Sequence, residues 1–154
     1  MRLSLDTNIL VRAFMDDEPD YRDVTSLVSL TNSQLCLDFG RVIEKEYRNN
    51  LDRSLGFQKW FKRLRDRNGV YLCNGKIPKR HRSKLGNMGC HEASDHVFIG
   101  AAFHTDKVLL SEDSDVGKGI RGTQPPHCDA LKYLTNVMGI KVLDVCEALD
   151  FLQS

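Results

Sequence analysis

The sequence lacks the long apolar runs, internal repeats and low-complexity tracts that mark membrane-spanning, solenoid and disordered proteins. No apolar run in its 154 residues approaches the roughly 18 residues that a membrane-spanning helix needs. The start of the chain also lacks the apolar core of a secretory signal, because Asp6 and Asn8 interrupt it. With 41% hydrophobic and 28% charged residues, the composition is typical of a globular domain. We therefore expect a cytoplasmic protein without a membrane partner.

Cysteine is present, but without the pattern of a disulfide framework or a zinc site. The five cysteines are an odd number and form no CxxC pair, so we expect reduced thiols, with Cys36 and Cys146 in the core. A rival zinc site, which would make the protein a zinc-stabilised adaptor, has these candidate ligands: Cys73, His81, Cys90, His91, His127 and Cys128. Zinc ligands usually occur in pairs two to four residues apart, and the adjacent pairs here do not fit that spacing.

The net charge of +1 conceals a strong asymmetry along the chain. Ten basic residues and one acid lie between Lys59 and Lys84, so this segment carries +9 and the remainder −8. Such a basic segment beside an acidic remainder indicates a polyanionic partner, and the alternative is a solvated basic face. The residues that we expect to contact nucleic acid are Lys59, Lys62, Arg63, Arg65, Arg67, Lys79, Arg80, Arg82 and Lys84.

Strand-like apolar runs alternate with segments of helical periodicity. We expect strands near residues 3–5, 35–37, 70–73, 108–111 and 141–145. The expected helices lie near residues 7–14, 20–30, 42–51, 57–64, 95–105, 128–138 and 146–152. This alternation predicts a single α/β domain over residues 1–154 with a mainly parallel central sheet of four to five strands. The basic stretch at about 74–92 lacks periodicity, and we expect a mobile surface loop there.

Acidic residues follow two of these strands and begin one of the helices. Asp6 ends the first strand, Asp113 and Asp115 follow the run at 108–111, and Asp95 opens the helix that precedes it. The carboxyl ends of parallel strands meet at one edge of a sheet, where ligands bind. Carboxylates gathered there repel one another unless a cation lies between them. The pattern therefore predicts a divalent cation, Mg²⁺ or Mn²⁺.

Four segments together resemble the motifs of the PIN-domain nuclease family. They are Leu5–Leu10 (LDTNIL), Gly40–Tyr47 (GRVIEKEY), Ser94–Ala102 (SDHVFIGAA) and Val108–Asp113 (VLLSED), and they span nearly the whole chain in the family's order. The resemblance implies a three-layer α/β/α fold and a metal-dependent ribonuclease activity. Many members of the family are toxins of toxin–antitoxin pairs, so the resemblance also implies an antitoxin protein as a partner.

The resemblance assigns roles to individual acids. It implies that Asp6, Glu46, Asp95 and Asp113 are catalytic metal ligands. We expect Asp115 to be an additional ligand through water, and Asn8 to cap the helix or to orient Asp6 by hydrogen bonding. Glu44 remains an alternative to Glu46: the two lie about 200° apart around a helix, so only one can face the cleft. Asp6 and Asp95 also have an alternative role as helix caps.

Together these features predict an endoribonuclease that hydrolyses phosphodiester bonds of single-stranded or looped RNA. The preference for RNA over DNA comes from the resemblance alone. The alternative is a catalytically silent PIN-like module that binds RNA or protein, and a homodimer is compatible with either. Trp60 and Phe61 can stack on bases, but their spacing with Phe57 and Leu64 favours core packing.

Overall fold

The computed structural model describes residues 1–90, 92–120 and 129–154 and has an α/β architecture. The strands are β1 (Arg2–Leu5), β2 (Gln34–Asp38), β3 (Val70–Cys73), β4 (Val108–Leu110) and β5 (Lys141–Leu143). The helices of the described ranges are α1 (Thr7–Phe14), α2 (Pro19–Leu30), α3 (Val42–Leu51), α4 (Leu55–Asp66), α5 (Lys79–Asn87), α6 (Ala93–Phe103), α7 (Asp129–Asn136) and α8 (Val145–Gln153), with a 3₁₀ helix, η1 (Ser114–Val116).

The five strands form one parallel sheet in the order β3-β2-β1-β4-β5. Leu3 of β1 pairs with Leu35 of β2, and Leu5 pairs with Leu110 of β4. The first three strands are added in one direction and the last two in the other, so the order reverses between β1 and β4. In open α/β sheets, ligands bind outside the carboxyl ends of the strands at such a reversal. Asp6 follows β1 and Asp113 follows β4, so the topology brings both to this position.

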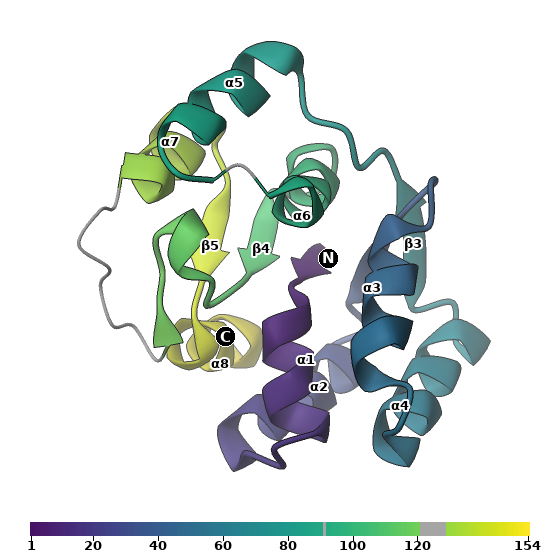
Figure 1. Ribbon diagram of the computed structural model, residues 1–154. Helices are drawn as coiled ribbons and strands as arrows, with labels where there is room; N and C mark the ends of the chain where they lie inside the picture. The colour runs from purple at the N-terminus through teal and green to yellow at the C-terminus, as the bar shows by residue number, and fades with distance from the viewer. Residues whose placement is uncertain (91, 121–128) are drawn as a thin grey trace.

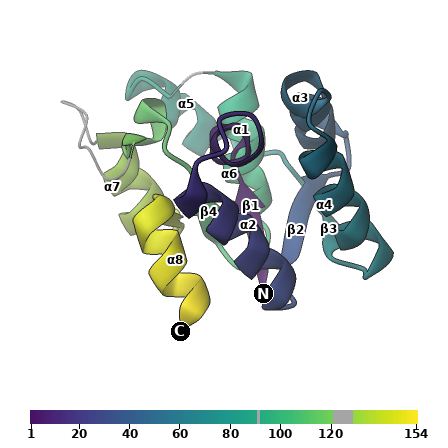
Figure 2. The ribbon, with the colours of Figure 1, turned by 90° about the horizontal axis from the view of Figure 1, so that it is seen from below.

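Helices cover both faces of the sheet, which confirms the expected three-layer arrangement. Figure 1 shows α5, α6 and α7 on one side of the strands and α1, α2, α4 and α8 on the other. Helix α6 packs on β1, β2 and β4, whereas α2 packs against α8. In Figure 2, seen from below, α8 and α2 lie side by side in front of the strands.

Local sequence signals explain where several helices begin. Pro19 occupies the first turn of α2, where its missing N–H removes no hydrogen bond. The Ser54 hydroxyl accepts a hydrogen bond from the Phe57 amide at 3.1 Å and caps α4. Asp144 and Glu147 form a reciprocal capping box at the start of α8. These caps fix the helices that support the sheet.

The apolar face of α4 belongs to the core, as its spacing predicted. Trp60 and Phe61 are buried, and the Trp60 indole N–H donates to the Thr25 carbonyl at 2.9 Å. Phe57 stacks on Phe61, and the Tyr47 ring meets both edge-on. These aromatic side chains fix α4 against α1 and α3, and they are not available to nucleic acid.

The expected loop at about 74–92 contains a helix, so that prediction was wrong. Residues 79–87 form α5, and His81 and Leu85 point into the core. His81 binds the Tyr133 hydroxyl at 2.5 Å and packs edge-on against Phe103. Two buried residues four positions apart are enough to dock a short helix on the core. Five basic residues between positions 74 and 92 hid this weak apolar signal in the sequence.

Smaller expectations also need correction. Cys146 is exposed, because Val145, Ala148 and Leu152 occupy the buried face of α8. The last two strands end earlier than expected, at Leu110 and Leu143. The expected start of the seventh helix at residue 128 lies outside the described residues. In the part of the chain that the structure describes, no helix has the length and apolar character to cross a bilayer.

Candidate metal centre

The site lies where the chain leaves β1 and β4, at the centre of the sheet. The Asp6 amide donates to the Leu110 carbonyl at 2.9 Å, which continues the β1–β4 ladder by one residue. Asp6 is therefore held at the end of the strand with its side chain above the sheet edge. Because the ladder fixes its backbone, this carboxylate is positioned before any ligand binds.

The alternative role of Asp6 as a helix cap is not realised. Asp6 occupies the N-cap position of α1, but its side chain makes no capping hydrogen bond there. Instead its Oδ2 accepts from the Ser111 hydroxyl at 2.7 Å. Asp6 is therefore held in the site while being only 7% exposed.

Asp95 comes to the same place from the first turn of α6. Helix α6 begins at Ala93 with Glu92 at the N-cap position, so the alternative cap role of Asp95 is also not realised. The Asp95 side chain is 8% exposed, and its Oδ2 has no hydrogen-bond partner. A buried carboxylate oxygen without a partner is costly, and a cation is the usual means of satisfying it. The N-terminus of α6 offsets part of this negative charge.

Asp113 follows β4 and begins η1. One of its oxygens accepts from the Asp115 amide at 2.8 Å, which closes the 3₁₀ turn. Its own amide donates to the Ser111 hydroxyl oxygen at 3.2 Å. Ser111 thus links Asp6 and Asp113 through a single hydroxyl. Sequence reasoning missed Ser111, whose role depends on a partner 105 positions away.

The three aspartates form one group that could hold a metal ion. One carboxylate oxygen from each of Asp6, Asp95 and Asp113 lies within 4.8 Å of the others. Burial raises the pKa of Asp6 to about 6, the Asp113 charge adds to this rise, and the Ser111 hydrogen bond opposes it. Burial and then the charges of Asp113 and Asp6 raise the pKa of Asp95 to about 8. Both pKa shifts therefore come first from burial and then from the neighbouring carboxylates.

A polar cleft of about 480 Å³ surrounds the group. Its acidic lining residues are Asp6, Asp16, Glu46, Glu92, Asp95, Asp113 and Asp115, and Arg12 is the base among the described lining residues. Arg12 is engaged by Glu18 at 3.0 Å. Another buried polar atom without a partner, the Thr7 hydroxyl, belongs to a residue of the same lining. The cleft therefore has the charge and the unsatisfied oxygens of a cation site.

Helix α3 directs Glu46, and not Glu44, to the cleft. Glu44 lies on another side of the helix and binds Arg48 at 3.0 Å and Arg65 at 2.5 Å. The hydroxyl of Tyr47, next to Glu46, donates to the Leu5 carbonyl and ties α3 to the end of β1. Glu46 lines the cleft but does not belong to the three-aspartate group. Glu46 therefore lies at the wall of the site, outside its closest group of carboxylates.

Asn8 and Asp115 occupy less direct positions. The Asn8 side-chain oxygen accepts from the Glu112 amide at 3.5 Å, so this side chain contacts the loop of Asp113. The backbone amide of Asn8, in contrast, acts on Asp6 and lowers its pKa. Asp115 lines the cleft. Glu112 itself is buried, accepts from Tyr21 Oη and the Val145 amide, and ties the loop to α2 and α8.

The basic residues divide into two surfaces. Those of α4 and those of α5 lie on opposite sides of the sheet (Figure 1). On α4, Lys62 pairs with Asp66 at 2.7 Å, and Arg65 pairs with Glu44. Arg67 is half-buried and donates to the carbonyls of Val28 and Ser33. The basic segment of the sequence is thus divided between two sides of the sheet, and Arg67 has a structural role.

The rival zinc ligands do not assemble among the described residues. There the three aspartates are the one group of acids, cysteines and histidines close enough to share an ion. Cys73 donates to the Leu37 carbonyl, and His81 binds Tyr133. Burial, followed by the aspartate charges, raises the pKa of Cys90 to about 12, which disfavours the thiolate that zinc requires. His91, His127 and Cys128 lie outside the described residues.

Comparisons with protein-family models, with curated proteins and with solved structures found no match. The fold and the site therefore define the class of protein directly. It is a three-layer α/β protein with a cluster of three aspartates, at the reversal of its strand order, that could bind a metal ion.

Proposed function

We propose that the protein is a metal-dependent endoribonuclease, similar to the PIN-domain nucleases, that hydrolyses phosphodiester bonds of single-stranded or looped RNA. The observation that carries the proposal is the convergence of Asp6, Asp95 and Asp113 within 4.8 Å in a cleft that Glu46 also lines. These four acids come from four separate segments of the chain. Core packing does not explain why Asp6 and Asp95 are buried, with raised pKa values, at the carboxyl ends of the strands.

The donor set suits Mg²⁺ or Mn²⁺, because hard divalent cations prefer carboxylate oxygens and water. Asp6, Asp95 and Asp113 would hold the ion, and Glu46 and Asp115 would complete the shell or orient its water. A bound ion lowers the pKa of coordinated water and neutralises charge on the phosphate. The Ser111 hydroxyl holds Asp6 and Asp113 close together, because it donates to the Asp6 carboxylate and accepts from the Asp113 amide. The chain thus supplies a preorganised set of oxygens to which a phosphodiester can be brought.

Substrate binding requires positive charge near this acidic cleft. Helix α5 supplies exposed bases, and Arg82 lines a pocket that adjoins the cleft. Contacts from such bases to phosphates give affinity that depends strongly on salt and little on sequence. A flexible single strand or loop can bring its scissile phosphate to the aspartates more readily than a rigid duplex can, which is why we propose it as the substrate.

A cleavage assay with a matched pair of variants tests the proposal. With Mn²⁺ or Mg²⁺, the wild-type protein should cleave single-stranded RNA internally, and EDTA should stop the reaction. Glu46→Gln should lower the rate by at least about tenfold, because it removes a charge at the cleft. Glu44→Gln is the control, since Glu44 binds arginines outside the cleft, and its rate should stay within about threefold of wild type.

The outcomes separate the proposal from its alternative. Metal-dependent cleavage that Glu46→Gln reduces and Glu44→Gln does not would support the nuclease. RNA binding without cleavage under any of these metals would instead identify a catalytically silent module. Equal loss in both variants would contradict the assignment of Glu46. If the protein is also the toxin of a pair, bacterial expression of wild type, but not of Glu46→Gln, should arrest growth until an antitoxin is supplied.

A further inference from the structure

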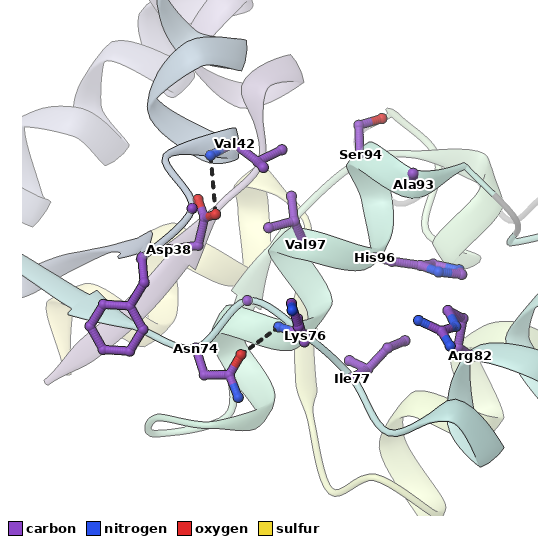
Figure 3. Close-up of a pocket in the computed structure, with 13 residues that line it drawn as sticks. Asp38, Val42, Asn74, Lys76, Ile77, Arg82, Ala93, Ser94, His96 and Val97 are labelled. Carbon is purple, nitrogen blue, oxygen red and sulfur yellow. Dashed lines mark hydrogen bonds between the residues drawn. The ribbon is translucent and has the colours of Figure 1, made fainter.

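A second, larger pocket adjoins the acidic cleft. This side pocket, of about 860 Å³, lies between the end of β2, the start of α3, the segment before α5 and the first turns of α6. Figure 3 shows Val42, Ile77 and Val97 coming to it from three different segments. Its size is typical of a small-ligand site with apolar walls and a few polar groups.

One wall of the side pocket carries an aromatic ring that packing does not use. Phe39 follows β2, lines the pocket and is 68% exposed. By contrast, Phe14, Phe57, Phe61 and Phe98 each pack against another aromatic ring. An exposed phenyl ring at the rim of an apolar pocket offers a flat face on which another ring can stack.

The polar groups of the side pocket suit a nucleotide. Lys76 and Arg82 bring positive charge, and both residues lie at its lining (Figure 3). His96 Nε2 lies 2.6 Å from the Cys90 carbonyl oxygen, which can only accept, so this nitrogen donates to it. The one acid among the described lining residues, Asp38, is buried, and its carboxylate accepts from the amides of Val42 and Ile43 at the start of α3. Its charge is therefore balanced within the protein.

The side pocket adjoins the acidic cleft at the start of α6. Ser94 lines both, and the next residue along α6 is Asp95 of the three-aspartate group. A strand whose phosphate reached the aspartates would therefore place a neighbouring nucleotide at the side pocket. The segment that forms the pocket floor is also fixed tightly, since a Cβ at Gly100 of α6 would lie 2.2 Å from the Gly75 carbonyl oxygen.

We propose that the side pocket receives one unpaired base of the substrate strand, next to the phosphate at the aspartates, and that Phe39 stacks on it while Lys76 and Arg82 contact the flanking phosphate. This inference rests on the proposed function and adds to it a substrate requirement: a base that is free to leave its stack. A base inside a duplex cannot enter such a pocket without unpairing. The charge of Lys76 and Arg82 favours a nucleotide over an apolar peptide as the occupant.

Binding of paired oligonucleotides, measured apart from cleavage, tests the proposal. The probes are a fluorescent oligouridylate and an abasic ribose-phosphate strand of equal length and charge. Their dissociation constants are measured by anisotropy with Ca²⁺ in place of Mg²⁺. Wild type should bind the oligouridylate about 5- to 100-fold more tightly than the abasic strand, the range expected for aromatic stacking on a base. Phe39→Ala should bring this ratio close to one, and Phe39→Tyr should preserve it.

Leu55→Ala is the matched control, because Leu55 is also 68% exposed but lies on α4, away from the side pocket. It should leave the ratio unchanged. A wild-type ratio near one, or a ratio that Phe39→Ala leaves intact, would overturn the proposal. Dissociation of a dimer by Phe39→Ala in sedimentation, with no change in the ratio, would assign the pocket to a second copy and also overturn it. Base-dependent binding without RNA cleavage would contradict only the nuclease, and cleavage without base-dependent binding only the side pocket.

Discussion

At the scale of single residues, the site is a balance between buried charge and its compensation. Asp6 and Asp95 are almost fully buried. Burial raises the pKa of both carboxyl groups, and the charges of neighbouring aspartates raise it further. Ser111 compensates part of this cost through its hydrogen bond to Asp6. The protein therefore keeps buried carboxylates close together, an arrangement that a bound metal ion could stabilise and that apolar packing does not require.

This balance predicts how the stability of the metal-free protein depends on pH. The folded-state pKa of Asp6 is about 6, above its ordinary value of 3.8, so the folded state binds the proton more tightly than the unfolded state. The contribution of Asp6 to the free energy of unfolding should be fully present below about pH 4 and should be lost as the pH rises through about 6. The difference between the two pKa values of Asp6 corresponds to about 3 kcal/mol of unfolding free energy. Asp95, with a pKa of about 8, extends the loss toward pH 8.

Urea unfolding in EDTA at pH 5 and pH 8 measures this dependence, with Asp6→Asn as the comparison. The variant carries no charge at position 6, so it should be more stable than wild type at pH 8 and should lose less stability between the two values. A wild-type protein that gains more stability than Asp6→Asn between pH 5 and pH 8 would show that the acids are not in conflict.

Some residues of the site could be predicted from the sequence and others could not. Asp6, Asp95 and Asp113 stand at ends of strands or starts of helices, and such positions can be read from periodicity. The choice of Glu46 over Glu44 needed helical geometry and the resemblance, and the structure places Glu46 at the cleft. Ser111 could not be assigned, because a serine after a strand has no distinctive chemistry until its partner's position is known.

At the scale of elements, the strands and the long helices follow from the apolar pattern. β4 is buried throughout and β1 is buried apart from Arg2, as expected for a parallel sheet covered on both faces. Helix α5 escaped prediction because its buried side consists of His81 and Leu85 amid many charges. What the sequence could not indicate was close packing between distant segments, above all the crossing of residues 74–77 over α6.

That crossing yields a prediction about stability. Gly100→Ala should destabilise the protein by about 1–3 kcal/mol, because its methyl group would meet the Gly75 backbone at 2.2 Å and displace the segment. Gly56→Ala is the control: it also lies in a helix, but its Cβ would make an ordinary 3.4 Å contact with Phe14. The control should be neutral or more stable by up to about 1 kcal/mol. Thermal unfolding compares them, and equal stability of both variants would refute the tight crossing.

At the scale of the whole molecule, charge is arranged around the cleft in a defined order. The acidic cleft lies at the centre of the sheet, and the side pocket adjoins it with two bases, of which Arg82 belongs to α5. The bases of α4 lie on the other side of the sheet. A polyanion that reaches the aspartates through the side pocket therefore meets α5 and not α4.

This arrangement predicts unequal effects of two matched charge removals. Arg82→Gln should weaken RNA binding and reduce the dependence of log Kd on log salt by about one, the effect expected for one lost phosphate contact. Lys59→Gln removes one exposed charge from α4 and should leave the salt dependence within error of wild type. Anisotropy titrations across a range of salt concentrations provide both values. A larger effect of Lys59→Gln would place the nucleic acid on the opposite side of the sheet.

The central claim is that Asp6, Asp95 and Asp113 together form a divalent-cation site. Titration of the purified, metal-free protein with Mn²⁺, followed by electron paramagnetic resonance of the free ion, measures it most directly. Wild type should bind Mn²⁺ with a defined stoichiometry, Asp95→Asn should lose at least about tenfold in affinity, and Glu44→Gln should match wild type. Equal binding by wild type and Asp95→Asn, or no binding by wild type, would contradict the account.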